Sequence, residues 1–252
     1  MTATVIASRG IITNPTALTP NIYDRGEAVI LDAARIQDVA DGARVPAVLA
    51  RGSGPVAART FDTRAASNGN LPMLRRTGGP GGLPCLELDG TASIKNGAAV
   101  SFDGGFYIAA MIKMDEWAAQ TVQRFIARVD GSAGMSIALS LIGSTPSVRI
   151  FGGTLSDNVT LSLASPLTTW QPLIVSWGSD NRARIVFGDA FVEGALARPV
   201  ASNLQIGSTP NGDLSGGAGL KAKIAELRHG AGSLTLAQAR ALAALLAEKY
   251  NL

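Results

Sequence analysis

The sequence predicts an all-β fold, an antiparallel β-sandwich with one C-terminal α-helix. From residue 83 onward, short segments alternate apolar and polar residues, and clusters of Gly, Ser, Asn and Asp separate them. The segment 235–252 instead repeats its apolar residues at helical spacing. A chain of 252 residues can hold such a sandwich as one domain, whose core is then large enough to need no disulfide or metal.

The first part of the chain shows little alternation. Residues 1–25 contain two prolines, several Thr and Asn residues and one short apolar patch, so we expect an extended N-terminal arm before a domain that covers residues 26–252. From Glu27 the sequence has apolar residues, and then a helix-like or turn-like segment that ends at Asp41-Gly42. Residues 51–83 are rich in Gly, Pro, Arg and Ser and predict long loops.

Period-two alternation predicts the strands. Segment 83–89 ends in Asp89-Gly90, a turn signal, and segment 106–113 has apolar residues on both faces, as expected for a strand that is covered on both sides. The clearest alternation lies in 135–141, where Met135 and Ile137 begin one apolar face. Further strands are predicted at 121–129, 147–151, 158–163, 170–177, 182–187, 203–206 and 220–228.

The C-terminal segment carries the signals of a helix. Thr235 and Gln238 have the spacing of a capping box, in which each side chain binds the free backbone N–H of the other residue. Leu242, Leu246 and Tyr250 then recur on one face. We therefore expect a helix at about 235–250 that packs its apolar stripe on the sandwich.

Composition and charge exclude several classes of protein. Charged residues make up only 16% of the chain, which is typical of a folded protein rather than a disordered one. The net charge is +3 and the basic residues are scattered, whereas a nucleic-acid binder concentrates them on one face. No apolar run is long enough to span a bilayer, and the N-terminus has no Sec-type signal. Cys85, the single cysteine, is expected to be a buried, inert thiol.

The C-terminal part also resembles a known family. The segment 223–228 (KIAELR), the following Leu234-Thr-Leu and the ending 246–252 (LAEKYNL) resemble the C-terminus of laminin G-like, concanavalin A-like lectin jelly-roll domains in phage virion and bacterial surface proteins. Similar stretches lie at 30–34, 85–90 and 170–177, so the resemblance covers about residues 27–252. It implies a concanavalin A-like jelly roll, a fold that serves lectins, glucanases, adhesion modules and virion parts alike.

The sequence predicts no catalytic residues, and we expect no enzyme. A retaining glycosidase needs two carboxylates about 5–5.5 Å apart, and Glu87 with Asp89 is the nearest pair on one strand face. We interpret Glu87 as an exposed strand residue and Asp89 as part of a turn. His229 is the single histidine, which excludes multi-histidine zinc sites, and we interpret it as a loop residue.

Four residues are candidates for binding a glycan. Sites on such sandwiches place aromatic rings against sugar faces and add hydrogen bonds from Asp and Asn side chains. Trp117 and Trp177 lie next to polar turns, and Asp180 and Asn181 follow Trp177 closely. The alternative interpretation is that both tryptophans pack in the protein and that Asp180-Asn181 forms a hairpin turn. No cofactor is expected, with calcium held by loop oxygens as the alternative, and Trp170 is assigned to the core.

Three functions stay open at this point. The first is a non-catalytic surface protein of a phage or phage-like virion (a fibre, spike or decoration protein) that recognises host cell-surface glycan. The arm 1–25 would anchor it to other virion proteins, with a homotrimer as one assembly.

A virion location would reconcile an extracellular type of fold with the lack of an export signal. A bacterial cell-surface or extracellular location by a non-Sec route is the alternative.

The second function is a purely structural capsid or tail component, and the third is a polysaccharide hydrolase or lyase. Neither nucleic acid nor membrane insertion is expected.

Overall fold

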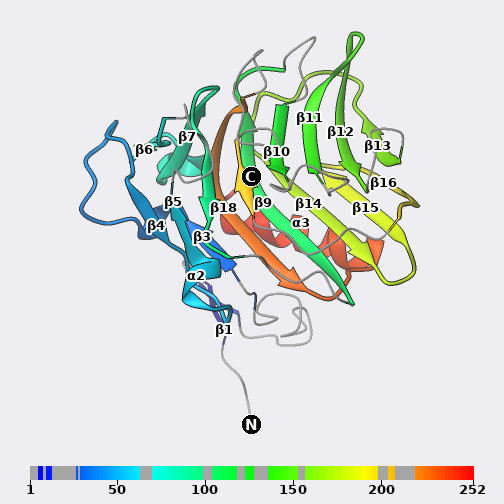
Figure 1. Ribbon diagram of the computed structural model, residues 1–252, viewed down its shortest axis with the longest axis horizontal. Helices are drawn as coiled ribbons and strands as arrows, with labels where there is room; N and C mark the ends of the chain where they lie inside the picture. Colours follow the sequence, from blue (N-terminus) through cyan, green and yellow to red (C-terminus); the bar gives the residue numbers. More distant parts are fainter. Residues whose placement is uncertain are drawn as a thin grey trace.

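The computed structural model describes residues 5–7, 10–12, 27, 29–62, 70–98, 104–117, 123–127, 136–152, 157–197, 204–207 and 219–252. Within these residues, two eight-stranded sheets lie face to face and a C-terminal helix covers one of them (Figure 1). The predicted antiparallel β-sandwich with one C-terminal helix is therefore confirmed. Residues 123–127 are described by their backbone alone, and Met135 lies outside the described residues.

The sheet under the helix is called the helix-side sheet. Its strands are β3 (Val29–Asp32), β6 (Met73–Arg75), β7 (Cys85–Asp89), β9 (Gly105–Met114), β14 (Gln171–Gly178), β15 (Arg182–Phe187), β16 (Ala190–Ala195) and β18 (Lys221–Ala231). They follow the order β16-β15-β14-β9-β18-β7-β6, and β3 pairs with β18. All these pairs are antiparallel.

The second sheet is called the far sheet. Its strands are β4 (Ala47–Leu49), β5 (Thr60–Asp62), β8 (Ile94–Asn96), β10 (Gln123–Ala127), β11 (Ser136–Ile142), β12 (Thr145–Phe151), β13 (Asn158–Ser162) and β17 (Gln205–Ile206). They follow the order β13-β12-β11-β10-β17-β8-β5-β4. Every strand predicted from alternation is present, with ends shifted by a few residues.

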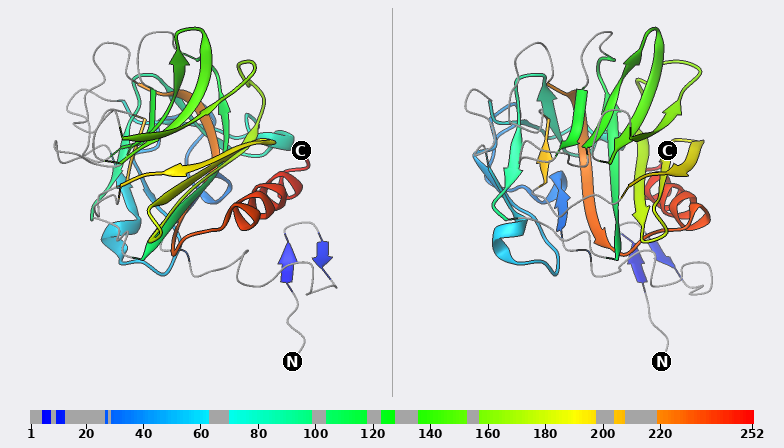
Figure 2. Two further views of the ribbon diagram at one scale, coloured as in Figure 1. Left: turned by 90° about the vertical axis from the view of Figure 1, so that its right-hand side faces the viewer. Right: turned by 45° about the vertical axis from the view of Figure 1, so that its right-hand side comes forward.

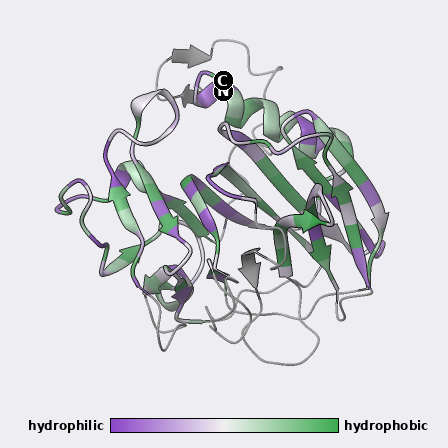
Figure 3. Ribbon diagram, turned by 90° about the horizontal axis from the view of Figure 1, so that it is seen from above, coloured by the Kyte–Doolittle hydropathy of each residue, from purple (hydrophilic) through white to green (hydrophobic). Residues whose placement is uncertain are grey.

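Strand β9 shows how the two cores arise. Phe106 and Ile108 point into the core between the two sheets, while Tyr107 and Ala109 point into a second core under the helix. All four side chains are fully buried, which confirms the expected strand with both faces covered. In Figure 3, green, apolar segments run along most strands.

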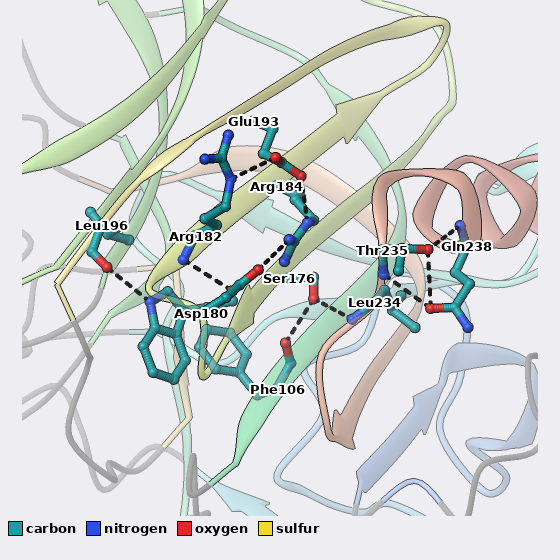
Figure 4. Close-up of polar contacts among 11 residues, drawn as sticks. Phe106, Ser176, Asp180, Arg182, Arg184, Glu193, Leu196, Leu234, Thr235 and Gln238 are labelled. Atoms are coloured by element: carbon teal, nitrogen blue, oxygen red, sulfur yellow. Dashed lines mark hydrogen bonds and ion pairs between the residues drawn. The ribbon is translucent and has the colours of Figure 1, made fainter.

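Helix α3 (Leu236–Lys249) covers the outer face of the helix-side sheet, and it lies outside the strands in both views of Figure 2. The predicted capping box is present: Gln238 N donates to Thr235 Oγ1 at 3.2 Å, and Thr235 N donates to Gln238 Oε1 at 3.0 Å (Figure 4). Leu242 and Leu246 are buried against the sheet. The helix is therefore fixed both by its own start signal and by burial of its apolar stripe.

The end of α3 is tied to the sheet by a buried polar cluster. The Glu226 carboxylate on β18 contacts Lys249 Nζ, and it accepts a hydrogen bond from Tyr250 Oη at 2.9 Å. Arg228 Nε lies 2.5 Å from the other Glu226 oxygen, and Arg228 Nη1 lies 3.4 Å from Glu27 Oε1. Glu27 and Glu226 are each 1% exposed, so the first and last parts of the domain share one desolvated network.

The segment before residue 83 holds more regular structure than predicted. The apolar residues that follow Glu27 form strand β3, because Val29 and Leu31 are buried and pair with β18. Only the short 3-10 helix η1 (Ala33–Arg35) follows it. The expected long loops contain the one-turn helix α2 (Val56–Arg59), strands β5 and β6, and the 3-10 helix η2 (Pro80–Gly82).

Two further expectations concern single residues. Cys85 is buried as predicted, and burial raises the pKa of its thiol to about 12. His229 is not a loop residue: it lies within β18 and is 1% exposed. Burial lowers the pKa of its imidazole to about 4, so His229 is neutral at pH 7.

Little of the expected arm is described. Residues 5–7 and 10–12 form an antiparallel pair of short strands, β1 (Val5–Ala7) and β2 (Gly10–Ile12). The rest of 1–25 lies outside the described residues. Within the described part of the chain, no helix has the length and apolar character that crossing a membrane requires.

Candidate functional site

The two predicted tryptophans lie in the core between the sheets. Trp177 is 1% exposed, and its Nε1 donates to the Leu196 carbonyl at 3.2 Å (Figure 4). Trp117 is 8% exposed, and its Nε1 donates to the Leu167 carbonyl at 3.0 Å. Its ring packs edge-on against Phe187. Neither indole has an open face for a sugar, so the assignment of Trp117 and Trp177 to a glycan site is corrected to a packing role.

Asp180 and Asn181 form the exposed hairpin turn between β14 and β15. Asn181 adopts a φ of 54°, a left-handed conformation that Asn tolerates in turns. Asp180 Oδ1 accepts from the Arg182 backbone N–H at 3.2 Å, and Asp180 Oδ2 lies 2.6 Å from Arg184 Nη2 (Figure 4). The hydrogen bond from Arg184 is the main cause that holds the pKa of Asp180 below its ordinary value. The hairpin-turn interpretation is confirmed, and the carboxylate is engaged by the protein itself.

The Asp180 carboxylate belongs to a network that joins β15 to β16. Glu193 accepts from Arg182 Nε at 2.6 Å and from Arg184 Nε at 2.7 Å, as Figure 4 shows. Among the described residues, no group of three His, Cys, Asp or Glu side chains lies close enough to hold a metal ion. The four residues predicted together from the sequence thus do not form one site, because only the turn reaches the surface.

A different site lies between α3 and strands β14 and β15 of the helix-side sheet. It is an open groove of about 990 Å³, within the size range of ligand-binding clefts. On the strand side it is lined by residues 170–172, 186 and 188–189, and on the helix side by residues of α3 and by Leu252. The groove is lined by Trp170, Gln171, Pro172, Val186, Gly188, Asp189, Ala237, Arg240, Ala241, Ala243, Ala244, Ala247 and Leu252.

The helix wall of the groove exists because its residues are small. Ala237, Ala241 and Ala244 follow one another at i, i+4 and i+7, so they form one stripe along α3. The larger Leu242 and Leu246 lie on the neighbouring stripe that packs against the sheet. The methyl groups of these alanines leave open space between the helix and the strands, whereas longer side chains would fill it.

Trp170 supplies the groove with an aromatic ring. It lies directly before β14 and is only partly buried, packed against the core under the helix on one side and lining the groove on the other. Its assignment to the core is therefore only half correct. Next to the groove, Phe191 is 44% exposed, and the Arg240 guanidinium lies 4.8 Å from its ring centroid.

Polar groups stand at the strand side of the groove. Asp189 lies in the tight turn between β15 and β16, where Gly188 has a φ of 58°. A Cβ at Gly188 would approach Gln171 Oε1 to 2.5 Å, so glycine lets the turn sit against Gln171. The groove thus combines an indole, a carboxylate, an amide and a guanidinium, which is the mixture of apolar surface and few polar groups that sugar sites use.

A second, smaller hollow of about 280 Å³ lies between β3, η1 and β4. Its lining residues fall within 30–51 and include no aromatic side chain. Arg35 Nε lies 3.7 Å from the Asp32 carboxylate there. Without a ring to cover a sugar face, this hollow is a weaker candidate than the groove beside α3.

The carboxylate pair of β7 is held in ion pairs. Glu87 accepts from Arg75 Nε at 2.8 Å, and this hydrogen bond is the main cause that lowers the pKa of Glu87. Burial alone would raise the pKa of Asp89, but hydrogen bonds from Thr91 and from Arg44 at 2.8 Å outweigh it and lower that pKa. A general acid needs a raised pKa, so neither carboxylate is tuned for that role.

No protein-family model matches the sequence, and no curated protein matches it either. Solved structures do resemble the fold. Domain 4 of AbnA, an extracellular arabinanase from Geobacillus stearothermophilus, solved in complex with arabinotriose, matches 69% of this chain and 82% of its own, with a TM-score of 0.51 and 19% identity. The binding domain of Paraclostridial Mosquitocidal Protein 1 matches 90% of this chain and 53% of its own, with a TM-score of 0.59 and 10% identity.

A GH54 α-L-arabinofuranosidase matches 82% of this chain and 50% of its own, with a TM-score of 0.59 and 11% identity. This chain thus spans about half the length of the toxin domain and of the arabinofuranosidase. At these identities the likenesses concern the fold. Together with the two sheets and the capped helix, they define the class: a jelly-roll-like β-sandwich.

Proposed function

We propose that this domain is a non-catalytic, lectin-like module of the laminin G-like, concanavalin A-like kind, and that it binds glycan in the groove beside α3. The partly buried Trp170 in a groove of about 990 Å³ carries the proposal. The structure in complex with arabinotriose supports it, because a related fold there accompanies a sugar.

The groove suits a sugar ring for physical reasons. The C–H face of a pyranose packs on the Trp170 ring, and the alanine stripe of α3 adds apolar surface. Asp189 accepts hydrogen bonds from hydroxyl groups, Arg240 donates them, and Gln171 does both. Arg240 is already oriented by its contact with Phe191, which reduces the entropy lost when a ligand binds.

Replacing Trp170 by Ala is expected to weaken glycan binding about tenfold or more, because the loss of an aromatic contact in a binding site costs about 1.4 kcal/mol or more. A glycan array identifies a ligand, and isothermal titration then compares the variants. Ile142→Ala is the matched control, since it removes an exposed apolar side chain from the far sheet. Equal affinity of Trp170→Ala and the wild type would refute the groove as the site.

The proposed binding needs no cofactor, and one further titration tests this. Affinity should be the same in calcium and in EDTA. A calcium requirement would point instead to a cation held by loop oxygens, and the Asp180-Asn181 turn would then be the first place to substitute.

The proposed location is the surface of a phage or phage-like virion, where the protein serves as a fibre, spike or decoration protein. The resemblance to virion domains supports it. The arm 1–25 would bind other virion proteins, and a homotrimer is the assembly we propose.

Deleting residues 1–25 is expected to abolish incorporation into particles while the domain stays folded. Glu27, the first described residue of the domain, forms the ion pair with Arg228 and is kept by this deletion. Particle-bound protein is measured by sedimentation and immunoblotting, and folding by thermal melting. Normal incorporation of the shortened protein would contradict the anchoring role.

A hydrolase or lyase is the second candidate, because the fold also resembles that of an arabinofuranosidase. The lowered pKa values of Glu87 and Asp89 favour binding over catalysis. Incubation with the polysaccharide found on the array should therefore release neither reducing ends nor unsaturated sugars. A purely structural capsid or tail component is the remaining alternative, and silence on the array would favour it.

A further inference from the structure

Arg149 stands in the middle of β12 on the outward face of the far sheet. Its strand neighbours Val148 and Ile150 point into the core between the sheets, so the Arg149 side chain points the other way. Its Nη2 donates to Ser140 Oγ at 2.8 Å. Its Nε is buried and has no hydrogen-bond partner. Among the described residues, no carboxylate forms an ion pair with this guanidinium.

Three other buried or half-buried arginines are paired with carboxylates, while the half-buried Arg59 and Arg76 donate to backbone carbonyls. Arg75 lies 2.8 Å from Glu87, Arg184 lies 2.6 Å from Asp180, and Arg228 lies 2.5 Å from Glu226. A desolvated guanidinium without a counter-charge costs free energy. Burial accordingly lowers the pKa of Arg149, with no opposing contribution from an acid, although an arginine of this kind stays protonated at pH 7.

The surroundings hold the guanidinium in place without neutralising it. The Arg149 Cζ lies 5.0 Å from the Phe151 ring centroid, a cation–π contact that fixes its orientation. Directly opposite on the neighbouring strands stand Ala138 and Thr160, which are short side chains. Ser140 is 1% exposed and holds the guanidinium by accepting from it, and the Thr160 hydroxyl donates to Asn158 Oδ1 at 2.8 Å. This part of the sheet therefore offers an oriented positive charge without a counter-charge.

We propose that Arg149 binds the carboxylate of an acidic sugar such as a uronic acid. A carboxylate can form two parallel hydrogen bonds with a guanidinium, which a single hydroxyl acceptor cannot do. Binding of a carboxylate at this site depends on Arg149 itself. That the carboxylate belongs to a sugar rests on the proposed function. Because α3 covers the opposite side of the sandwich, this site is separate from the groove.

The site is tested on the full chain with three probes: oligogalacturonate, its methyl-esterified form, which has no charge, and acetate. Oligogalacturonate should bind about tenfold more tightly than the ester, since a charge-assisted hydrogen bond is stronger than a neutral one. The side-chain Nε–Hε NMR signal of Arg149 should shift with oligogalacturonate and with acetate.

Arg149→Gln should abolish the preference for the charged probe and leave binding of the ester unchanged. Arg182→Gln is the matched control, because it removes one positive charge from a guanidinium that is already paired with Glu193. Arg149→Lys is the second variant: it keeps the charge, loses the paired geometry and should also lose the preference. Thermal melting checks that all three variants fold.

Several outcomes would overturn the site. Equal losses in Arg149→Gln and Arg182→Gln would mean that net charge alone is responsible. An Arg149 signal that no probe shifts would exclude anion binding there. If no glycan binds but acetate shifts the signal in a saturable way, the proposed function fails and the anion site stands. Loss of glycan binding in Trp170→Ala tests the groove and not the Arg149 site.

Discussion

Replacing Glu226 by Gln is expected to destabilise the domain by about 3–5 kcal/mol, the usual cost of removing one partner from a buried ion pair. The Glu226 carboxylate is 1% exposed and contacts Arg228, Lys249 and the Tyr250 hydroxyl. Gln keeps the size of the side chain and removes the charge. Urea unfolding followed by tryptophan fluorescence measures the change in the free energy of unfolding.

Glu87→Gln is the matched control for this prediction. Glu87 lies on β7, which pairs with β18, and it binds Arg75 at 2.8 Å. Its side chain is 18% exposed and that of Arg75 is 35% exposed. A pair that water screens contributes at most about 1 kcal/mol. Similar costs for the two substitutions would show that burial does not set the strength of the Glu226 cluster.

The same cluster predicts how stability depends on pH. Burial alone would raise the pKa of Glu226, but the charges of Arg228 and Lys249, with the hydrogen bonds from Lys249 and Tyr250, outweigh it and lower that pKa. A carboxylate with a depressed pKa in the folded state stabilises the protein fully above its unfolded pKa, and this stability is lost as pH falls through the folded pKa. Between pH 7 and pH 3, Glu226→Gln should therefore lose less stability than the wild type. Parallel curves would contradict the pKa direction.

The parts of the fold that were predicted correctly have local signals. The capping box of Thr235 and Gln238 lies within one turn, so the start of α3 could be located from neighbouring residues. The period of two in β9 and β11 follows from the geometry of a single strand. Strands β3 to β6 were not predicted, because they are three or four residues long and depend on distant partners. Leu31, for example, pairs with Leu227.

The candidate site could be predicted less well, for a related reason. The groove exists where α3 passes the turn at Gly188-Asp189, and no sequence spacing places these segments together. A partial signal was present: Ala237, Ala241 and Ala244 form a stripe of small residues beside the buried leucines. The core position of Trp177 could also have been predicted. In a strand every second residue points to the same face, and Trp177 shares its face with Leu173 and Val175, which point into the core.

Trp177→Ala is expected to destabilise the domain by about 3–5 kcal/mol, the usual cost of truncating a buried aromatic side chain. The indole is 1% exposed in the core between the sheets, and its Nε1 donates to the Leu196 carbonyl at 3.2 Å. The substitution leaves a cavity between β14 and the far sheet and removes the donor from that carbonyl. Chemical unfolding measures the loss of stability.

Two companion variants separate the packing role of Trp177 from a binding role. Trp177→Phe keeps an aromatic ring in the core and should bind glycan as tightly as the wild type, because this position has no open ring face. Trp170→Ala should show the opposite behaviour, with weak binding and a much smaller loss of stability, because Trp170 is only partly buried. If Trp177→Phe stayed folded and lost affinity, the indole would be needed by the ligand after all. The core position of Trp177 in β14 would then have to open on binding.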